Sequence, residues 1–386
     1  MITVVGWDGS PLSAKAAGCL QQAALVAGPE RILRRFKLPV PNGELLDVLD
    51  EHLEHGDGPA VVLAEGDPGF FGVVRALRGH GLKPAVIPAS SIITRAFARA
   101  GLSWEDALIV APEGPGQLNR VVNACRAHHK VGLIVTPGVG PAEVARELAP
   151  TTPRALIVCE NLGGPDERVT HSRMGEATTR PWKDPDVVLV LDPLYRADHR
   201  AWVAGAGPGP DEWAVGGDLP PEVSAYVLAK LGPRLGDLVW DVGAGSGGIA
   251  VECARLGAAV MAVERDEEAC ARLRANVIGH GVKVALTRGQ APPALEPLPD
   301  PDAVFVGGGG PDVIVACAAR APSRLVCALK TVEQVPAVLQ RLKEHGYRAE
   351  GTQIQASRLV VQADGTHSLT AEDPVFVVHA RKVFWA

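Results

Sequence analysis

The amino-acid sequence predicts an α/β protein of two domains. Its 386 residues suit two domains at roughly 100 to 200 residues each. Short apolar runs that end at turn-forming residues alternate with stretches of helical periodicity, which is typical of strand–helix–strand units. This alternation stops at about residue 196, so we place the first domain at 1–200, a linker at 201–217 and the second domain at 218–386.

Strands of the first domain are predicted from its apolar runs, and helices from the amphipathic stretches between them. The expected strands are ITVVG at 2–6, AVVLAEGDP at 60–68, KPAVIP at 83–88, VGLIVTPG at 131–138, RALIVCE at 154–160 and DVVLVLDP at 186–193. Most of these runs end at glycine or proline, where the chain turns.

The second domain shows the same alternation after a predicted helix at 221–231. Its expected strands are DLVWDVGAG at 237–245, AAVMAVERD at 258–266, VKVALTRG at 282–289, PDAVFVGGGG at 301–310 and RLVCAL at 324–329. Helical segments lie between them, which predicts an independent parallel sheet of Rossmann-like type.

Composition excludes several classes of protein. Apolar residues make up 47% and charged residues 21% of the chain, the balance of a soluble globular protein. The net charge of -6 argues against nucleic acid and membranes as partners and favours a small ligand. The 7 cysteines form no CxxC pair and have no zinc-like spacing, and we find neither a signal peptide nor a membrane-spanning apolar run. We therefore expect a cytoplasmic protein without a metal site.

A glycine-rich loop gives the strongest local signal. The segment from Asp241 to Gly248 follows a predicted strand and precedes a helix predicted at 249–256. Its glycines allow the backbone to turn tightly and to approach a ligand closely. The spacing also satisfies the dinucleotide pattern, and Glu264 at the end of the next strand can accept hydrogen bonds from a ribose. NAD and S-adenosylmethionine both contain that ribose, and a glycine turn that binds nothing is a third interpretation.

The carboxylate of Asp241 favours S-adenosylmethionine over NAD. It precedes the first glycine of the loop by two residues. A negative charge there would repel a pyrophosphate but attract the ammonium and sulfonium groups of S-adenosylmethionine.

Several sequence blocks of the second domain resemble the decarboxylating precorrin methyltransferases of cobalamin biosynthesis. They are WDVGAGSGGIAVE at 240–252, AVERD at 262–266, GQAPPAL at 289–295 and LPDPDAVFVGGGG at 298–310. The resemblance implies a class I methyltransferase fold. The residues that we expect at the cofactor are Asp241, Gly243, Ala244, Gly245, Ser246, Gly247, Glu264, Gly289, Gln290 and Ala291, and those that we expect at the substrate are Gly307, Gly308 and Gly309.

The first domain resembles the tetrapyrrole methylase family, of class III methyltransferases. The blocks are VLAEGDPGFFG at 62–72, VIPASSIITRAFARAGLSWEDA at 86–107, TPGVGPAEVARELA at 136–149 and ENLGGPDERV at 160–169. Taken alone, the Gly-Asp-Pro-Gly turn is better interpreted as an ordinary turn. With the resemblance, cofactor contacts are expected at Gly66, Asp67, Pro68, Ser90, Ser91 and Thr136.

The order of the two domains resembles the bifunctional precorrin-6Y (precorrin-6B) C-5/C-15 methyltransferases, decarboxylating. This implies S-adenosylmethionine-dependent methylation at C-5 and C-15 with decarboxylation of the C-12 acetate to give precorrin-8X, one cofactor site per domain and a homo-oligomer. The sequence departs from the family pattern at Glu65, Ala89, Glu113 and 218–220. Two alternatives therefore stay open: a diverged methyltransferase for another tetrapyrrole or small molecule, and a chain in which one domain is silent and structural or regulatory.

Catalytic residues are harder to predict than cofactor residues. An electron-rich meso carbon needs no strong base, so the enzyme mainly supplies in-line placement at roughly 3 to 3.5 Å and exclusion of water. Arg358 is our candidate for the acetate that is lost, with a solvated surface arginine as the alternative. Thr331 and Glu333 follow a predicted strand and are further candidates, with helix capping as the alternative.

Overall fold

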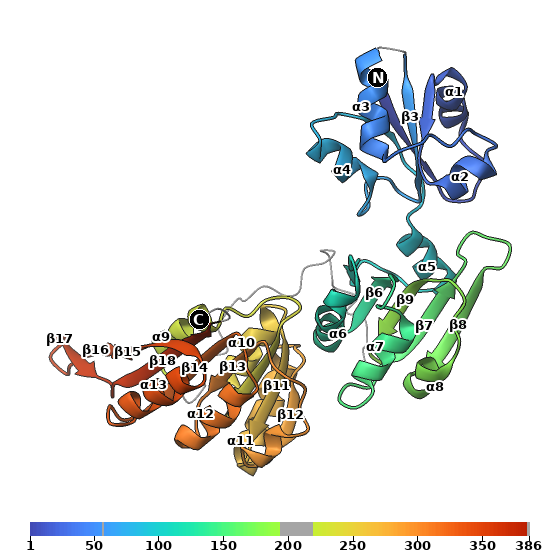
Figure 1. Ribbon diagram of the computed structural model, residues 1–386. Helices are drawn as coiled ribbons and strands as arrows, with labels where there is room; N and C mark the ends of the chain where they lie inside the picture. Colours follow the sequence, from blue (N-terminus) through green and yellow to red (C-terminus); the bar gives the residue numbers. More distant parts are fainter. Residues whose placement is uncertain (56–57, 194–218, 384–386) are drawn as a thin grey trace. The chain divides into compact units, whose positions relative to one another are not determined.

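The computed structural model describes residues 1–55, 58–193 and 219–383. The predicted linker at 201–217 lies outside the described residues. The chain divides into two compact units, one of residues 1–115, 132–145 and 154–201 and one of residues 116–131, 146–153 and 202–386. Figure 1 colours the chain from blue to red in this order, and each unit is described here by itself.

A four-stranded parallel sheet in the order β2-β3-β1-β4 begins the first unit. Its strands are β1 (Ile2–Trp7), β2 (Leu25–Ala27), β3 (Ala60–Glu65) and β4 (Ala85–Ile87), and its helices are α1 (Ala14–Gln22), α2 (Glu30–Arg35), α3 (Leu45–His55) and α4 (Val73–Gly79). Figure 1 shows these helices around the sheet. β1 and β3 are buried along nearly their whole length, which explains their continuous apolar sequences.

Gly6 allows the turns that follow β1, β3 and β4 to meet. A Cβ atom at this position would lie 2.5 Å from the carbonyl oxygen of Gly66, 2.8 Å from Pro68 and 2.9 Å from the amide nitrogen of Ala89. Any side chain would therefore push these turns apart. The Gly-Asp-Pro turn and the Pro-Ala-Ser-Ser segment consequently lie at one edge of the sheet.

The second sheet of the first unit has five strands in the order β5-β6-β9-β7-β8. Its strands are β5 (Leu108–Val110), β6 (Lys130–Ile134), β7 (Ala155–Glu160), β8 (Arg168–Arg173) and β9 (Pro185–Leu191). The neighbouring helices are α5 (Ile92–Ala100), α7 (Pro141–Leu148) and α8 (Met174–Thr179). A short 3-10 helix at Pro115–Gln117 leads to α6 (Leu118–Ala127), which belongs to the second unit. β7 runs antiparallel to both β8 and β9. α5 begins at Ser91, whose hydroxyl accepts the Thr94 amide, and buries Phe97 against this sheet.

The second unit is built on a seven-stranded sheet in the order β12-β11-β10-β13-β14-β18-β15. The first five strands are parallel, whereas β18 pairs antiparallel with β14 and β15. These strands are β10 (Leu238–Val242), β11 (Ala259–Glu264), β12 (Ala285–Arg288), β13 (Ala303–Val306), β14 (Arg324–Leu329), β15 (Tyr347–Ile354) and β18 (Val375–Lys382). A separate hairpin consists of β16 (Ser357–Val361) and β17 (His367–Ala371).

Helices pack on this sheet and bury its apolar side chains. They are α9 (Pro221–Leu231), α10 (Gly248–Arg255), α11 (Glu267–Gly279), α12 (Gly310–Ala319) and α13 (Gln334–Glu344), with a 3-10 helix at Pro293–Leu295. The α/β class predicted from the sequence is confirmed, with α9 at its predicted bounds. Trp240 in the central strand β10 is completely buried.

A buried ion pair joins β14 to the residue before β10. The Arg324 Nη2 atom donates to Asp237 Oδ2 at 2.5 Å, and its Nη1 atom donates to the carbonyl oxygen of Gly232 at 3.0 Å. Both side chains of the ion pair are less than a tenth exposed. Arg234 also lies 3.6 Å from Asp237 but is 68% exposed.

We predict that Asp237→Ala lowers the free energy of unfolding of the second unit by about 3 to 5 kcal/mol, because it leaves the buried guanidinium of Arg324 unpaired. Arg234→Ala is the matched control, and its loss should stay below about 1 kcal/mol since the arginine is exposed. Urea unfolding followed by tryptophan fluorescence measures both. Equal losses in the two variants would contradict the assigned role of the buried pair.

Candidate active site

A cavity of about 530 Å³ opens at the carboxyl edge of the parallel strands of the second unit. Its wall comes from the ends of β10 to β14 and the loops that follow them. The strand order reverses at β10, with β11 and β12 on one side and β13 and β14 on the other. Open α/β sheets bind ligands at such a reversal, outside the carboxyl ends of the strands.

Ten of the residues predicted from the sequence line this cavity. They are Gly243, Ala244, Gly245, Glu264, Gly289, Gln290, Ala291, Gly307, Gly308 and Gly309. The structure thus brings the glycine loop, the acid after β11, the segment after β12 and the glycines after β13 to one place. A Cβ added at Gly308 would meet nothing within 4 Å, so the backbone there faces open space.

Glu264 holds the glycine loop in place. One oxygen of its carboxylate accepts the Gly245 amide at 2.9 Å, and the other accepts the amides of Arg265 and Asp266 at 2.8 and 2.9 Å. A carboxylate accepts about four hydrogen bonds, so these three leave capacity for one further donor. The last residue of β11 therefore shapes the cavity and still faces into it.

Ser246 and Gly247 belong to the same loop but do not line the cavity. Ser246 is buried, and its carbonyl oxygen accepts the Asn276 side-chain amide at 2.9 Å. A Cβ atom at Gly247 would lie 2.6 Å from Leu273. These two predicted cofactor residues therefore pack against α11 and hold the glycine loop in place. Gly243, Ala244 and Gly245 of the same loop line the cavity.

Asp241 also lies outside the cavity lining. Asp241 is 1% exposed, and neither oxygen of its carboxylate has a hydrogen-bond partner of ordinary distance and angle among the described residues. Burial raises the pKa of Asp241 to about 7, an effect that the charge of Glu264 strengthens and the backbone amide of Ala250 partly offsets. Val242 and Gly243, the two residues that follow Asp241, line the cavity, whereas Asp241 does not. An orphaned buried carboxylate at this position suits a ligand that carries positive charge.

The three predicted catalytic residues lie outside the lining of this cavity. Arg358 donates two hydrogen bonds to Glu222, at 2.6 and 2.8 Å, and another to Glu372 at 2.7 Å. Glu333 occupies the N-cap position of α13 without a side-chain capping bond, and Thr331 precedes it. The residue next to Thr331, Lys330, does line the cavity.

Lys330 and Arg272 are cavity residues that the sequence analysis missed. Lys330 directly follows β14, so a charged residue after a predicted strand was the available signal. Its side chain forms no ion pair with any described residue. Arg272 belongs to α11, and only the fold brings that helix to the cavity.

Four of the six predicted cofactor residues of the first unit line two different hollows, whereas Gly66 and Ser91 line neither. Asp67, Pro68 and Thr136 line a cavity of about 740 Å³. The Asp67 carboxylate accepts the Gly69 amide at 2.8 Å, which closes the turn that Gly66 begins with a positive φ of 63°.

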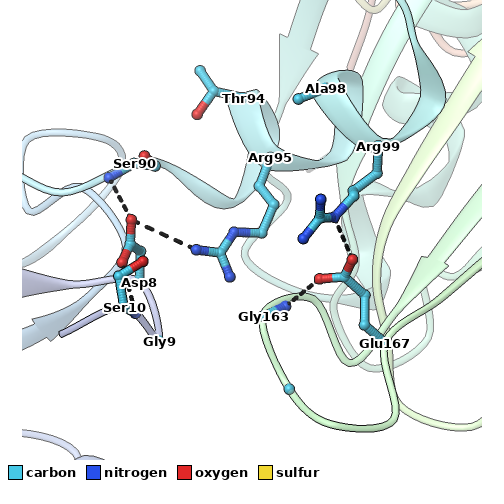
Figure 2. Close-up of a pocket in the computed structure, with 11 residues that line it drawn as sticks. Asp8, Gly9, Ser10, Ser90, Thr94, Arg95, Ala98, Arg99, Gly163 and Glu167 are labelled. Carbon is cyan, nitrogen blue, oxygen red and sulfur yellow. Dashed lines mark hydrogen bonds and ion pairs between the residues drawn. The ribbon is translucent and has the colours of Figure 1, made fainter.

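Ser90 lines a different hollow of about 620 Å³, together with Asp8, Arg95 and Glu167 (Figure 2). Ser91 is the N-cap of α5 and lies in the lining of neither hollow. The sequence analysis did not single out Asp8, Arg95 or Glu167, although two of them fall within the quoted blocks.

Within the described ranges, no three His, Cys, Asp or Glu side chains gather in a way that could hold a metal ion. The same residues include no helix that is long and apolar enough to span a membrane.

Comparison with known proteins identifies both halves. Residues 8–178 match the family described as tetrapyrrole (corrin/porphyrin) methylases, and residues 216–382 match the precorrin methyltransferase domain. A precorrin-6Y C(5,15)-methyltransferase (decarboxylating) of Sinorhizobium sp is 33% identical over 77% of this chain and 73% of its own length. A protein of the same name from Mycobacterium tuberculosis is 30% identical over 92% of each chain. The chain belongs to this family.

A shorter relative of these precorrin-6Y methyltransferases is informative about the division into domains. The probable cobalt-precorrin-6B C(15)-methyltransferase (decarboxylating) of Pyrobaculum calidifontis is 38% identical over 41% of this chain and 86% of its own length. Its name contains only one of the two methylations.

The unpaired carboxylate of Asp241 gives a prediction about stability and pH. Its pKa in the folded protein, about 7, lies above the ordinary 3.8, so the folded state binds a proton more tightly than the unfolded state. Its contribution to stability is therefore complete below about pH 4 and disappears as the pH rises through 7. The free energy of unfolding of Asp241→Asn minus that of wild type should therefore grow by about 2 to 3 kcal/mol from pH 5 to pH 8, measured without ligand.

Urea unfolding at several pH values measures this difference. Glu268→Gln, an exposed change on α11, should show no such trend with pH. A difference between Asp241→Asn and wild type that stays constant from pH 5 to pH 8 would contradict the raised pKa.

Proposed function

We propose that the chain methylates precorrin-6B at C-5 and C-15 and decarboxylates its C-12 acetate, giving precorrin-8X in cobalamin biosynthesis. Each domain holds its own S-adenosylmethionine. Membership of the precorrin-6Y methyltransferase family supports the reaction. The observation that carries the second cofactor site is the cavity in which the glycine loop, Glu264 and the segment 289–291 meet.

The residues of the second domain suit S-adenosylmethionine better than NAD. Glu264 has capacity for one more donor, which a ribose hydroxyl would supply. The buried carboxylate of Asp241 has no described partner, and positive charge nearby would favour its ionised form. The pyrophosphate of NAD would instead add two negative charges beside two carboxylates. When bound, S-adenosylmethionine supplies an electrophilic methyl group.

The protein's own contribution is mainly placement and exclusion of water. The backbone at Gly308 lines the cavity and faces open space, so a flat macrocycle can approach it closely. Lys330 adds a positive charge after β14, which suits a substrate with many carboxylates. No strong base is required of these residues, in keeping with a nucleophilic meso carbon.

The first domain offers a second cofactor site at the Gly-Asp-Pro turn. Asp67, Pro68 and Thr136 lie together in its 740 Å³ cavity, which also has Phe70 and Phe71 in its wall. Apolar walls with a few polar groups are usual for cofactor sites. The matching family consists of tetrapyrrole methylases, which supports a methylation at this domain.

We further propose that the enzyme acts in the cytoplasm as a homo-oligomer. All seven cysteines are free thiols and six of them are buried, which suits a reducing compartment. Size-exclusion chromatography with light scattering measures the oligomeric state.

The reaction itself gives a direct test. Incubation of the enzyme with precorrin-6B and methyl-labelled S-adenosylmethionine should yield a product with two added methyl groups and one carbon dioxide lost, as measured by mass spectrometry. A single methyl gain would instead identify one domain as silent. No methyl gain, with S-adenosylmethionine still bound, would favour a different substrate.

The two cofactor sites should fail separately. Glu264→Ala removes a charged hydrogen-bond acceptor in the second domain, so binding of S-adenosylmethionine there should weaken about 10- to 100-fold. Methylation at C-15 and decarboxylation should then fall together, while methylation at C-5 continues. Asp67→Ala should weaken methylation at C-5 alone, because it opens the turn in the first domain.

Label position in the products distinguishes the two methylations. Glu268→Ala and Asp47→Ala are matched controls on exposed helix surfaces of the respective domains. If Glu264→Ala abolished both methylations while the protein stayed folded, a single shared cofactor site would replace the two-site proposal.

A further inference from the structure

Three segments of the first unit meet around the hollow that Ser90 lines. They are the turn after β1 at Asp8, the start of α5, and the loop between β7 and β8 with Gly163 and Glu167 (Figure 2). Two of these segments belong to the sequence blocks 86–107 and 160–169. Of the residues in these blocks, only Ser90 and Ser91 were expected to contact the cofactor. The hollow has a volume of about 620 Å³, and four charged side chains contribute to its lining.

Its two carboxylates are held by backbone amides. Asp8 accepts the Ser10 amide at 3.0 Å and the Ser90 amide at 3.3 Å. Glu167 accepts the Gly163 amide at 2.7 Å and pairs with Arg99. Burial opposes the charge on Asp8, but hydrogen bonds from Ser10 and the Ser90 amide, together with the charge of Arg95, outweigh it and lower the pKa of Asp8 below its ordinary value.

Arg95 is the group in this hollow that lacks a close partner. Its side chain is only 17% exposed and packs against Gly163, where a Cβ atom would lie 1.8 Å from the guanidinium. Among the described residues its ion-pair partner is Asp8, at 3.5 Å, which is longer than a charged hydrogen bond. A guanidinium has five N–H donors, and most of those on Arg95 have no acceptor among the described residues. Figure 2 shows it between Asp8 and the loop of Glu167.

Arg99 provides a contrast one helical turn later on α5. It donates to Glu167 through Nε and is 55% exposed. Water and a carboxylate therefore satisfy Arg99, whereas the neighbouring Arg95 is confined and poorly paired.

We propose that Arg95 binds a carboxylate of the ligand that enters this hollow. The inference rests on the proposed function, under which the ligand is the tetrapyrrole and the group is one of its acetate or propionate side chains. A carboxylate can form two parallel hydrogen bonds with a guanidinium at about 2.7 to 2.9 Å. These distances are shorter than the 3.5 Å between Asp8 and Arg95, so a ligand carboxylate would compete only with a weak internal ion pair.

The charge balance of the hollow favours a carboxylate over a phosphate. Arg95 and Arg99 are matched by Asp8 and Glu167, so the lining carries no excess positive charge. A singly charged carboxylate can pair with Arg95 without a second cation, whereas a phosphate dianion would lie beside two carboxylates. Arg95 is therefore a substrate-binding residue of the first domain.

Steady-state kinetics of the full chain with precorrin-6B tests the inference. Arg95→Gln should raise the KM of C-5 methylation for precorrin-6B about 10- to 100-fold, the effect of losing charged hydrogen bonds. The KM for S-adenosylmethionine and the rate of C-15 methylation should not change. Arg95→Lys should restore part of the loss, and Arg78→Gln, an exposed arginine of α4 that lines neither hollow of the first unit, is the matched control.

Asp8→Asn separates ligand binding from a merely structural ion pair. An asparagine keeps one oxygen that accepts the Ser10 amide but removes the charge that competes for Arg95. The KM for precorrin-6B should then stay the same or fall. If Asp8→Asn and Arg95→Gln raised this KM equally, the ion pair would be structural and the inference would be overturned. An unchanged KM in Arg95→Gln would overturn it as well.

A binding measurement distinguishes failure of the inference about Arg95 from failure of the proposed function. Uroporphyrin, a stable tetrapyrrole with eight carboxylates, can be titrated into the full chain and followed by its fluorescence. If wild type gave no C-5 product but bound uroporphyrin more tightly than Arg95→Gln did, the proposed function would fail and the inference would stand. Equal binding by wild type and Arg95→Gln would contradict the inference.

Discussion

Backbone N–H groups at the carboxyl ends of parallel strands need acceptors, and in this protein carboxylate side chains supply them. Glu264 accepts three such groups from the glycine loop and from the two residues that follow β11. Because unsatisfied buried amides are costly, the position of the loop depends on this one side chain. The cavity of the second unit therefore has a wall whose shape does not depend on a ligand.

The first unit uses the same arrangement in a different sheet. Asp8 follows β1 and accepts amides from its own turn and from Ser90 after β4, while Glu167 accepts the Gly163 amide. Gly6 makes this possible, since it lets the three turns approach one another. In both units a carboxylate positions a loop and also sets the electrostatic potential that a ligand meets.

Local patterns explain what the sequence could predict. The buried strands β1, β3, β10 and β11 have continuous apolar sequences, and the glycine loop lies within a few residues, so spacing alone identified them. The antiparallel strands between residues 347 and 382 were not predicted. All five residues of β16 are exposed, so no buried face marks this strand in the sequence. β18 has the apolar run VFVV, but its partner β14 lies some fifty residues earlier in the sequence, so local spacing does not reveal the pairing. Arg95 and Arg272 lie within helices, and only the fold brings each of them to a cavity. Arg358 was chosen from its neighbours in sequence, but Glu222, 136 residues away, is its partner.

Among the residues that the structure describes, Asp241 and Arg95 are poorly paired, and their side chains have opposite signs of charge. Asp241 lies behind the proposed cofactor cavity with no described hydrogen-bond partner, and Arg95 faces the proposed substrate hollow with one distant carboxylate. A buried charge without a partner destabilises the fold, and proteins keep such groups mainly where function requires them. A cationic ligand in the cavity would act on the buried Asp241 through its charge alone, whereas a carboxylate at Arg95 would supply a direct partner. Neither group forms, with any described residue, a strong internal contact that a ligand would first have to break. The weak pairing of these charges in the free protein therefore favours ligand binding.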